Sequence, residues 1–272
     1  MLTFKLLLAY DGTDLVGWQR QPEGVSVQGL LEDALAPFQA EPVSVVGAGR
    51  TDAGVHATGQ VASTHLMSPA VGAGELQRAL NARLPPTVRV IGAEDAPPSF
   101  HARFDARTKT YEYRILNGPV VSPFVHRYAW HVPWPLDVDR MAQAARAIEG
   151  THDFACFQST GSDVATSVRQ VFESRVVLAP SAPAPAVVPD AVIEGDRLIV
   201  YRITGTGFLR HMVRAIVGTL VEIGRGSADP RLVSRLLEGG VRAAAGPTAP
   251  ARGLCLAAVS YADPPAAVAA HR

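Results

Sequence analysis

Residues 2–10 read LTFKLLLAY, a largely apolar run that predicts the first strand of the chain. The next periodic segment is VQGLLEDALAPFQA, residues 27–40, in which apolar residues recur at helical spacing. Two strands, a helix and a further strand are then predicted at about 43–47, 57–65, 74–84 and 87–93. The resulting order, β-α-β-β-α-β, is that of a ferredoxin-like unit.

The rest of the chain repeats this order with one added helix. It begins with a strand at 110–117 and a helix at 136–150, for which Asp137 is the expected N-cap. The remaining strands are predicted at about 168–178, 191–204 and 253–261, and the remaining helices at about 207–223 and 230–238.

These patterns predict an α+β fold made of two ferredoxin-like, RRM-like halves. The N-terminal half spans residues 1–105 and the C-terminal half spans 106–261. Residues 262–272 are expected to form a flexible tail, and the Pro- and Ala-rich stretch 179–190 a surface loop. A cleft between the two sheets would be the default site for a ligand.

Composition and charge exclude several classes of protein. The 47% content of hydrophobic residues excludes a wholly disordered chain, and no apolar run approaches the roughly 18 residues that span a membrane. We interpret the N-terminal apolar run as a strand and not as a signal peptide, and we expect a cytoplasmic protein. Cys156 and Cys255 stand outside any CxxC pattern, so neither a zinc site nor a disulfide framework is indicated.

The two halves carry opposite charge. Residues 1–105 hold 7 Lys and Arg against 11 Asp and Glu, a net charge of −4, whereas residues 106–272 hold 18 against 14, a net charge of +4. All but two of the 25 basic residues are Arg, a side chain suited to phosphate and base edges, although a coding bias would give the same count. Because the whole chain is neutral, any nucleic-acid surface must be local.

The densest polar cluster is GRTDAGVHA, residues 49–57. Asp52 lies between Arg50 and the flexible pair Ala53-Gly54, and the strand-like segment that follows argues against a helix N-cap. One Asp together with His56 is too few for a metal site, and the eight His residues form no metal-binding pattern, so no metal is predicted. The remaining interpretation is a single carboxylate that acts as nucleophile or base, held ionised by a cation.

The strand TKTYEYRI, residues 108–115, offers a second candidate surface. Lys109, Tyr111 and Tyr113 lie on one face of it, because strand side chains alternate. Paired aromatic residues on one face are often core, but beside a cation they also suit base stacking.

A third candidate is FLRHMVRAIVG, residues 208–218. Arg210 and Arg214 are four residues apart, so a helix here would present both on one face. They are either solvated or directed at Asp52 or at phosphate.

Three other motifs have simpler interpretations. YDGTD, residues 10–14, resembles an aspartyl-phosphate phosphatase motif, but Ala9 occupies the position of the nucleophile, which leaves an Asp-Gly turn or a ligand-contacting loop. Trp18, in the loop GWQRQ, is either a packing residue or a stacking platform. HDFACF, residues 152–157, is interpreted as packing around the site.

Together these segments resemble the tRNA pseudouridine synthase A family. The matching stretches run in order from Tyr10 to Tyr261 and are YDGTDLVGWQRQP, VQGLLEDAL, GRTDAGVHATGQVA, FHARFDARTKTYEYRI, HDFACF, GTGFLRHMVRAIVG and PARGLCLAAVSY. The departures are Leu15, where the family usually has an aromatic residue, a longer 179–190 loop, and the C-terminal tail.

The resemblance implies an isomerase that converts uridine to pseudouridine at nucleotides 38, 39 and 40 of the tRNA anticodon stem-loop. It implies that Asp52 is the catalytic nucleophile, that Arg214 pairs with it and that Tyr111 packs on the target base. It also implies that Arg50 takes part in extruding that base, which must leave the stem to react. Lys109 and Arg210 are the further candidates for substrate binding.

The resemblance further implies two ferredoxin-like halves joined into one pseudouridine-synthase-type antiparallel sheet with a central active-site cleft. It implies a homodimer in which one tRNA spans both subunits. The reaction is a net isomerisation, so no cofactor is expected. Asp52 could attack or deprotonate the sugar or add to the base, and the residues alone do not choose among these.

Two alternatives compete with this prediction. A non-catalytic RNA-binding protein with two RRM-like units would suit the Arg content, but it has no use for Asp52, and the RRM signature is absent. A carboxylate-dependent glycosidase would need a second catalytic carboxylate, and no second Asp or Glu stands in a comparable motif.

Overall fold

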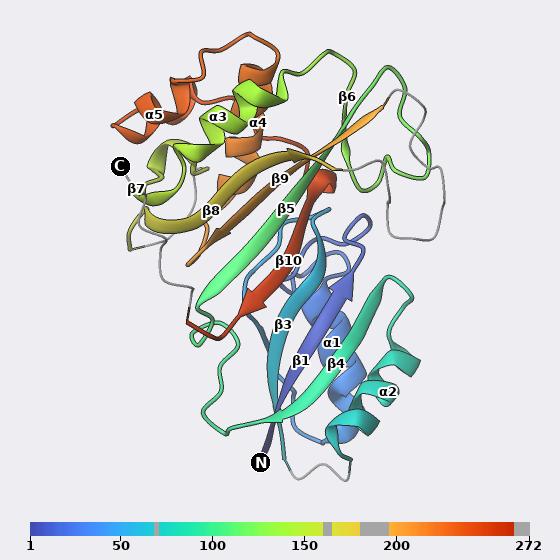
Figure 1. Cartoon of the computed structure of the whole chain (residues 1–272). Coiled ribbons are helices and arrows are strands. Elements are labelled where there is room, and N and C mark those ends of the chain that lie inside the picture. Colours follow the sequence, from blue (N-terminus) through green and yellow to red (C-terminus); the bar gives the residue numbers. More distant parts are fainter. Residues whose placement is uncertain (68–70, 160–164, 180–195, 264–272) are drawn as a thin grey trace. The chain divides into compact units, whose positions relative to one another are not determined.

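The computed structural model describes residues 1–67, 71–159, 165–179 and 196–263. The chain divides into two compact units (Figure 1). Unit 1 contains residues 1–107 and 255–262, and unit 2 contains the remainder. Each unit contains sheet strands with helices packed on them, and most of the strand pairs are antiparallel, so the predicted α+β class is confirmed.

The sheet of unit 1 is built around β1 (Leu2–Tyr10). This strand pairs antiparallel with β3 (His56–Leu66) on one side and with β4 (Val88–Ala96) on the other. The short β2 (Val45–Gly47) pairs antiparallel with β3, and β10 (Leu254–Ser260) pairs parallel with it through Cys255 and Leu256. The last strand of the chain therefore extends the sheet of the first unit.

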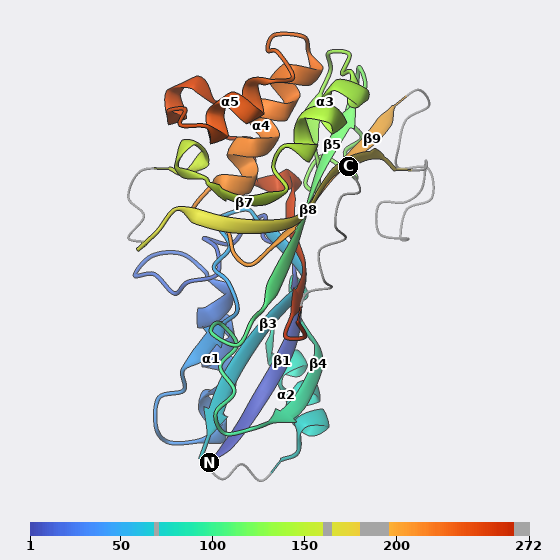
Figure 2. The same ribbon diagram turned by 60° about the vertical axis from the view of Figure 1, so that its left-hand side comes forward.

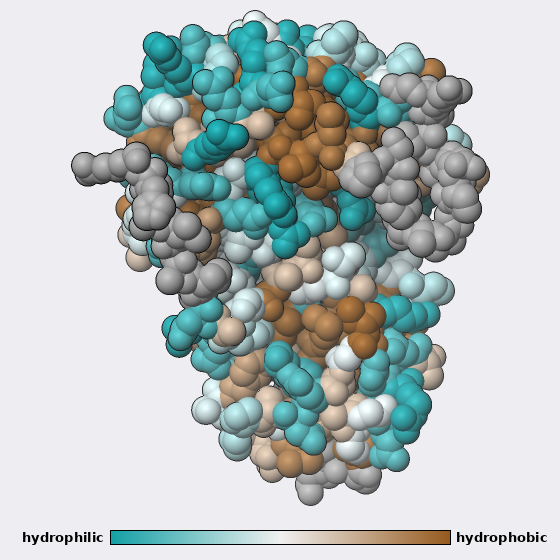
Figure 3. Space-filling model, viewed as in Figure 1, coloured by the Kyte–Doolittle hydropathy of each residue, from teal (hydrophilic) through white to brown (hydrophobic). Residues whose placement is uncertain are grey.

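The alternation of side chains along β1 separates the two faces of this sheet. Phe4, Leu6 and Leu8 are fully buried on the face that packs against α1 (Val27–Leu35) and α2 (Ala73–Arg83), the two helices behind the sheet in Figure 1. Leu7 points to the opposite face, where it is 39% exposed. Figure 3 shows apolar side chains gathered on part of the surface of this unit.

Local sequence explains where α1 begins and ends. The Ser26 side chain accepts a hydrogen bond from the Gly29 N–H at 3.1 Å and so caps the first turn. The helix was predicted to reach residue 40, but it ends at Leu35 and continues as a 3-10 turn over Ala36–Phe38. Pro37 lies in that turn and has no N–H to continue the α-helical pattern.

The sheet of unit 2 has the order β5-β9-β8-β7. β5 (Thr108–Asn117) pairs antiparallel with β9 (Arg197–Gly205), and the chain of antiparallel pairs continues through β8 (Val168–Leu178) to β7 (Gly150–Asp153). β6 (Trp130–Val132) pairs parallel with β5. Figure 2 shows the helices of this unit together on one side of the sheet: α3 (Val138–Arg146), α4 (Met212–Gly224) and α5 (Leu232–Leu237).

Two predicted helices of unit 2 have different bounds in the structure. α4 begins at Met212 and not near residue 207, because His211 has a left-handed backbone (φ 62°) that no α-helix contains. Arg210 therefore precedes the helix, and the prediction that it shares a helix face with Arg214 is wrong. α3 is capped by Asp137 as predicted but ends at Arg146, and Gly150 (φ 111°) instead begins β7.

The remaining predictions have mixed outcomes. β6 and β7 were not predicted, because strands of three or four residues carry too short an alternation. Phe154, Cys156 and Phe157 are buried, which confirms that HDFACF is a packing segment. Most of the 179–190 loop and of the 262–272 tail lie outside the described residues. No helix in the described ranges is both long and apolar enough to cross a membrane.

Two glycines in helices give a matched test of this packing. A Cβ on Gly218 of α4 would lie 1.7 Å from the Pro247 carbonyl oxygen, whereas a Cβ on Gly74 of α2 would meet nothing closer than 3.9 Å. Gly218→Ala is expected to destabilise the fold by at least ~1–3 kcal/mol through overpacking, and Gly74→Ala to stabilise it by up to ~1 kcal/mol. Urea unfolding of both variants checks this, and equal effects would contradict the packing of α4 described here.

Candidate active site

Asp52 lies in a tight turn directly before β3. The Val55 N–H donates to the Asp52 carbonyl at 3.1 Å, and the third residue of the turn, Gly54, has φ 76°, a conformation that favours glycine. The strand begins at His56, so Asp52 caps no helix, as predicted. Its side chain is half-buried.

The segment after β1 holds this turn from one side through main-chain contacts. Trp18 N–H donates to the Thr51 carbonyl at 3.0 Å, and Gly54 N–H donates to the Leu15 carbonyl at 3.3 Å. The two backbones come so close that a Cβ on Gly17 (φ 106°) would lie 2.6 Å from the Thr51 oxygen. Only glycine fits at this approach, and the carboxylate of Asp52 is consequently carried on backbone with little freedom.

Beneath the turn lies a buried hydrogen-bond network. The hydroxyls of Tyr10 and Thr51 are 2.8 Å apart, and the Gln60 amide donates to Tyr10 Oη at 3.3 Å and to the Gly49 carbonyl at 2.8 Å. Burial raises the pKa of Tyr10 to about 12, so its hydroxyl stays neutral near pH 7. The network fixes the turn on both sides of Arg50, which is itself exposed.

His56 has a structural position in the same region. Its Nδ1 accepts a hydrogen bond from the Gly12 N–H at 3.1 Å and lies 3.2 Å from Asp11 Oδ1. Asp11 also accepts from the Thr13 N–H at 3.0 Å, which makes YDGTD an Asp-Gly turn that supports the start of β3. Over the ranges that the structure describes, no three His, Cys, Asp or Glu side chains gather as a metal site.

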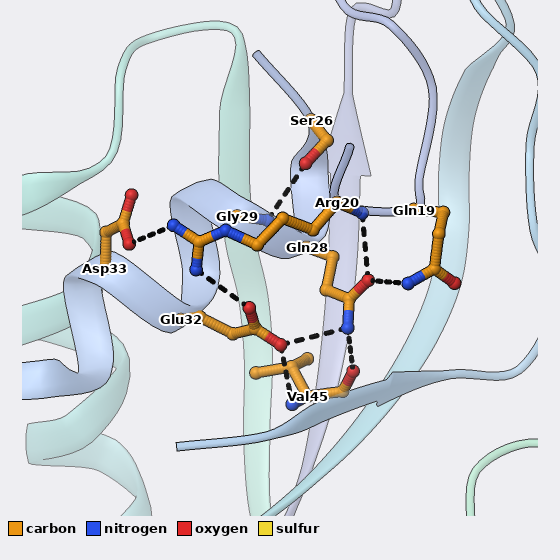
Figure 4. Close-up of polar contacts among 8 residues, drawn as sticks. All are labelled: Gln19, Arg20, Ser26, Gln28, Gly29, Glu32, Asp33 and Val45. Atoms are coloured by element: carbon orange, nitrogen blue, oxygen red, sulfur yellow. Dashed lines mark hydrogen bonds and ion pairs between the residues drawn. The ribbon is translucent and has the colours of Figure 1, made fainter. Parts of the chain in front are cut away.

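The GWQRQ loop is fastened to α1 (Figure 4). Arg20 forms ion pairs with Glu32 at 3.0 Å and with Asp33 at 2.7 Å, and Gln28 accepts from the Arg20 N–H at 3.0 Å. Trp18 is only 2% exposed and packs so close to Gly47 that a Cβ there would overlap its ring. Of the two interpretations of Trp18, packing is therefore confirmed.

In unit 2, β5 carries the two tyrosines that the sequence singled out. Tyr113 is fully buried, and its hydroxyl donates to the Pro250 carbonyl at 2.7 Å, so this residue is core. Tyr111 is 7% exposed and meets the Phe208 ring edge-on, with centroids 5.2 Å apart. Phe208 thus fixes the orientation of Tyr111. Lys109 is half-buried on the same strand.

Arg214 forms two hydrogen bonds with the backbone of Ala249. Its Nε donates to the Ala249 carbonyl at 2.8 Å, and the Ala249 N–H donates to the Arg214 carbonyl at 3.0 Å. Burial raises the pKa of Tyr113, and the positive charges of Arg214 and Arg252 act in the opposite direction. Arg214 therefore lies close to the strand that carries Tyr111, as a fixed and half-buried cation.

His211 sets the start of the helix that carries Arg214. It is the only described residue other than glycine with a positive φ, and its Nδ1 lies 2.8 Å from the Ser159 hydroxyl. Its carbonyl accepts from the Ala215 N–H at 2.9 Å, which closes the first turn of α4. Arg210, immediately before it, is exposed.

The predicted site residues fall into two groups. Arg50 and Asp52 belong to unit 1, and Lys109, Tyr111, Arg210 and Arg214 belong to unit 2. Sequence reasoning missed the supporting residues Tyr10, Gln60, Ala249 and His211. Gln60 gave a signal, since it is a lone amide in an apolar strand pattern, but Ala249 acts through its main chain and gave none.

Comparison with known proteins gives the family. A sequence profile described as tRNA pseudouridine synthase matches residues 7–105 and 144–262. The chain belongs to the tRNA pseudouridine synthase family. The enzyme is therefore an isomerase, and the predicted resemblance is confirmed. Both matched ranges contain candidate site residues: the Asp52 turn lies in the first and Arg214 in the second.

Individual relatives match over almost their whole length. The enzyme is 44% identical over 263 residues to tRNA pseudouridine synthase A of Syntrophotalea carbinolica, which covers 96% of this chain and 97% of that protein. The proteins of the same name from Solibacter usitatus and Moorella thermoacetica are each 43% identical and match over 96% of this chain and 100% of their own length.

The network under the Asp52 turn predicts a pH-dependent effect of Tyr10→Phe. At pH 8 the variant should lose ~1–2 kcal/mol of stability, because the buried Thr51 hydroxyl loses a partner. The ordinary tyrosine pKa of 10 is raised to about 12 in the folded enzyme, so Tyr10 stabilises the fold fully below pH 10 and progressively less up to pH 12. Phe cannot ionise, so the difference in free energy of unfolding between the native enzyme and Tyr10→Phe should shrink between pH 10 and pH 12.

Urea unfolding at pH 8 and pH 11 measures both free energies of unfolding. A difference that stays constant between the two pH values would contradict the neutral, buried state of the Tyr10 hydroxyl.

Proposed function

We propose that the enzyme isomerises uridine to pseudouridine at nucleotides 38, 39 and 40 of the tRNA anticodon stem-loop, with Asp52 as the catalytic nucleophile. The observation that carries this proposal is the support around Asp52. The side chain is half-buried at the tip of a turn held by main-chain bonds to Leu15 and Trp18 and by the buried Tyr10 hydroxyl. Such support suits a group that must meet one atom of its substrate repeatedly in the same geometry.

The reaction needs a carboxylate but no oxidant or reductant. The N1–C1′ bond of the uridine breaks, the uracil turns, and C5 bonds to C1′. The C5 proton leaves to solvent, and N1 takes up a proton. A bond that Asp52 forms to the substrate breaks again as product forms, which regenerates the carboxylate.

Arg214 would keep this carboxylate ionised. Its Nε is bound to Ala249, which fixes the plane of the guanidinium, and the terminal nitrogens of an oriented guanidinium suit a carboxylate. We assign Tyr111 to pack on the uracil. Its contact with Phe208 would hold its ring in place during the turn of the base.

Three basic residues complete the proposed substrate contacts. A uridine within the stem must leave its stack, at a cost of roughly a few kcal/mol, and Arg50, two residues before Asp52 and exposed, would fill the gap. Arg210 is exposed and Lys109 half-buried, and both would contact phosphates.

The proposal extends to fold and assembly. The strand order β4-β1-β3 with β2 beside β3, and both helices on one face, supports a ferredoxin-like first half. We propose that a second such half completes a pseudouridine-synthase-type sheet with a central cleft, and that the enzyme acts in the cytoplasm.

The proposed assembly is a homodimer that binds one tRNA across both subunits. Sedimentation equilibrium should then give about twice the chain mass of 28.8 kDa at micromolar concentration. A monomer that is fully active on tRNA would contradict this part of the proposal.

Asp52→Asn and Asp52→Ala should abolish isomerisation while tRNA binding persists. Tritium release from tRNA labelled at uridine C5 reports the reaction itself, because only isomerisation frees that hydrogen. We expect a loss of at least ~10³-fold in kcat, the scale seen when a nucleophile is removed. Filter binding measures the retained affinity for tRNA.

Asp95→Asn is the matched control, since Asp95 is an exposed carboxylate of the same unit on β4. It should keep full activity. Release by Asp52→Ala at the native rate would remove Asp52 from the mechanism, and binding of tRNA without release by the native enzyme would favour a non-catalytic RNA-binding protein.

A further inference from the structure

Phe104 is the most exposed large apolar side chain among the described residues, with 76% of its surface accessible. It lies in the 101–105 loop, residues His101 to Asp105, between β4 and β5. Single exposed apolar residues are common and need no explanation by themselves. This one differs because the loop around it is rigid and because two other side chains are arranged on its ring.

The base of the loop is anchored to the sheet of unit 1. Ala102 is fully buried, its N–H donates to Ser63 Oγ of β3 at 3.1 Å, and its carbonyl accepts from the Tyr261 hydroxyl at 2.8 Å. Phe100 packs against Tyr261 with ring centroids 5.1 Å apart. The loop therefore cannot turn Phe104 inward without breaking buried contacts.

The tip of the loop is closed by its own hydrogen bonds. Asp105 Oδ2 accepts from the His101 N–H at 2.8 Å, and the Asp105 N–H donates back to the His101 carbonyl at 3.1 Å. The His101 Nδ1 accepts from the N–H groups of Arg103 and Phe104, both at 3.2 Å. With the backbone closed in this way, the side chains of Arg103 and Phe104 are exposed at the tip.

The side chains beside Phe104 form a stack with a cation. The His101 ring lies nearly parallel to it, with centroids 4.3 Å apart and an angle of 28° between the planes. The Arg103 guanidinium carbon lies 5.7 Å from the Phe104 centroid, within cation–π range. An exposed aromatic ring with a flanking Arg is the chemistry by which proteins bind the bases of unpaired nucleotides.

The separation between the loop and Asp52 follows from the spacing of residues along β3. Ser63, its anchor, lies seven residues along β3 from His56, a distance of about 23 Å at 3.3 Å per residue. His56 follows the Asp52 turn directly, so Phe104 is too far from Asp52 to touch the reacting uridine. At about 3.4 Å per stacked base, this separation equals roughly six or seven nucleotides along one strand.

We propose that the 101–105 loop is a stacking platform for an unpaired nucleotide of the bound tRNA, remote from the nucleotide that reacts. The proposal rests on the proposed function, since it takes tRNA as the ligand. The platform adds affinity and register without chemistry. Unit 1 is acidic overall, and Arg103 supplies a local positive charge beside the exposed ring.

The test compares Phe104→Ala, Phe104→Leu and Phe104→Trp in the full-length enzyme. Loss of one base stack should weaken tRNA binding about tenfold for the Ala and Leu variants, while the Trp variant should keep or improve the affinity. KM for tRNA should rise in step and kcat at saturating tRNA should stay unchanged. The indole fluorescence that Phe104→Trp adds should be quenched when tRNA binds.

Phe124→Ala is the matched control, because Phe124 is also exposed (63%) but belongs to unit 2 and has no ring or cation contact of this kind among the described residues. It should bind tRNA as the native enzyme does. Native affinity for Phe104→Ala, or a Phe104→Leu variant that binds as well as Phe104→Trp, would overturn the platform.

Two further outcomes distinguish the platform from a subunit contact and from the proposed reaction. A change in oligomeric mass of Phe104→Ala, without a change in tRNA affinity per active site, would show a subunit contact instead and overturn the RNA assignment. If the native enzyme released no tritium but Phe104→Ala still weakened tRNA binding, the proposed reaction would fail and the platform would stand.

Discussion

The hydrogen bond between Tyr10 and Thr51 joins the two parts of unit 1 on which the site depends. Tyr10 ends β1, the central strand, whose inward residues Phe4, Leu6 and Leu8 are fully buried. Thr51 immediately precedes Asp52 and shares its turn. The core on one face of the sheet thus fixes the end of β1, and this end fixes the turn. A buried hydroxyl pair left half-satisfied would cost more than the bond itself contributes, which favours a single arrangement of the turn.

Elements whose side-chain pattern is sustained over many residues were predictable from the sequence, and the structure confirms them. β1 and β8 have the predicted bounds, and the Asp137 cap of α3 was recognisable because an acidic residue preceded an amphipathic run. The candidate site loop was singled out for a different reason. Asp52 precedes a strand and therefore caps no helix. With this common structural role excluded, a chemical role for its carboxylate was the simpler interpretation.

What could not be predicted depends on backbone conformation and main-chain partners. The sequence predicted a helix over about 207–223, yet α4 starts only at Met212, because His211 adopts a left-handed conformation that its residue type does not predict. One partner of Arg214 is the backbone carbonyl of Ala249, which any residue type would supply. The periodicity of side chains can be recognised in the sequence. The backbone conformation of His211 and the bond from Arg214 to Ala249 depend on segments that come together only in the folded chain.

In the roles proposed for them, Asp52 and Phe104 would be presented to a large ligand by one sheet in two different ways. The Asp52 turn is fixed by buried polar bonds, which suits a group whose position must be reproducible to a fraction of an ångström. The 101–105 loop is equally rigid in its backbone but presents an apolar ring to water, where stacking tolerates sliding of the partner base. The proposed action on neighbouring nucleotides would need both: a reacting group with a fixed position, and a remote stacking contact that persists when the RNA shifts by one nucleotide.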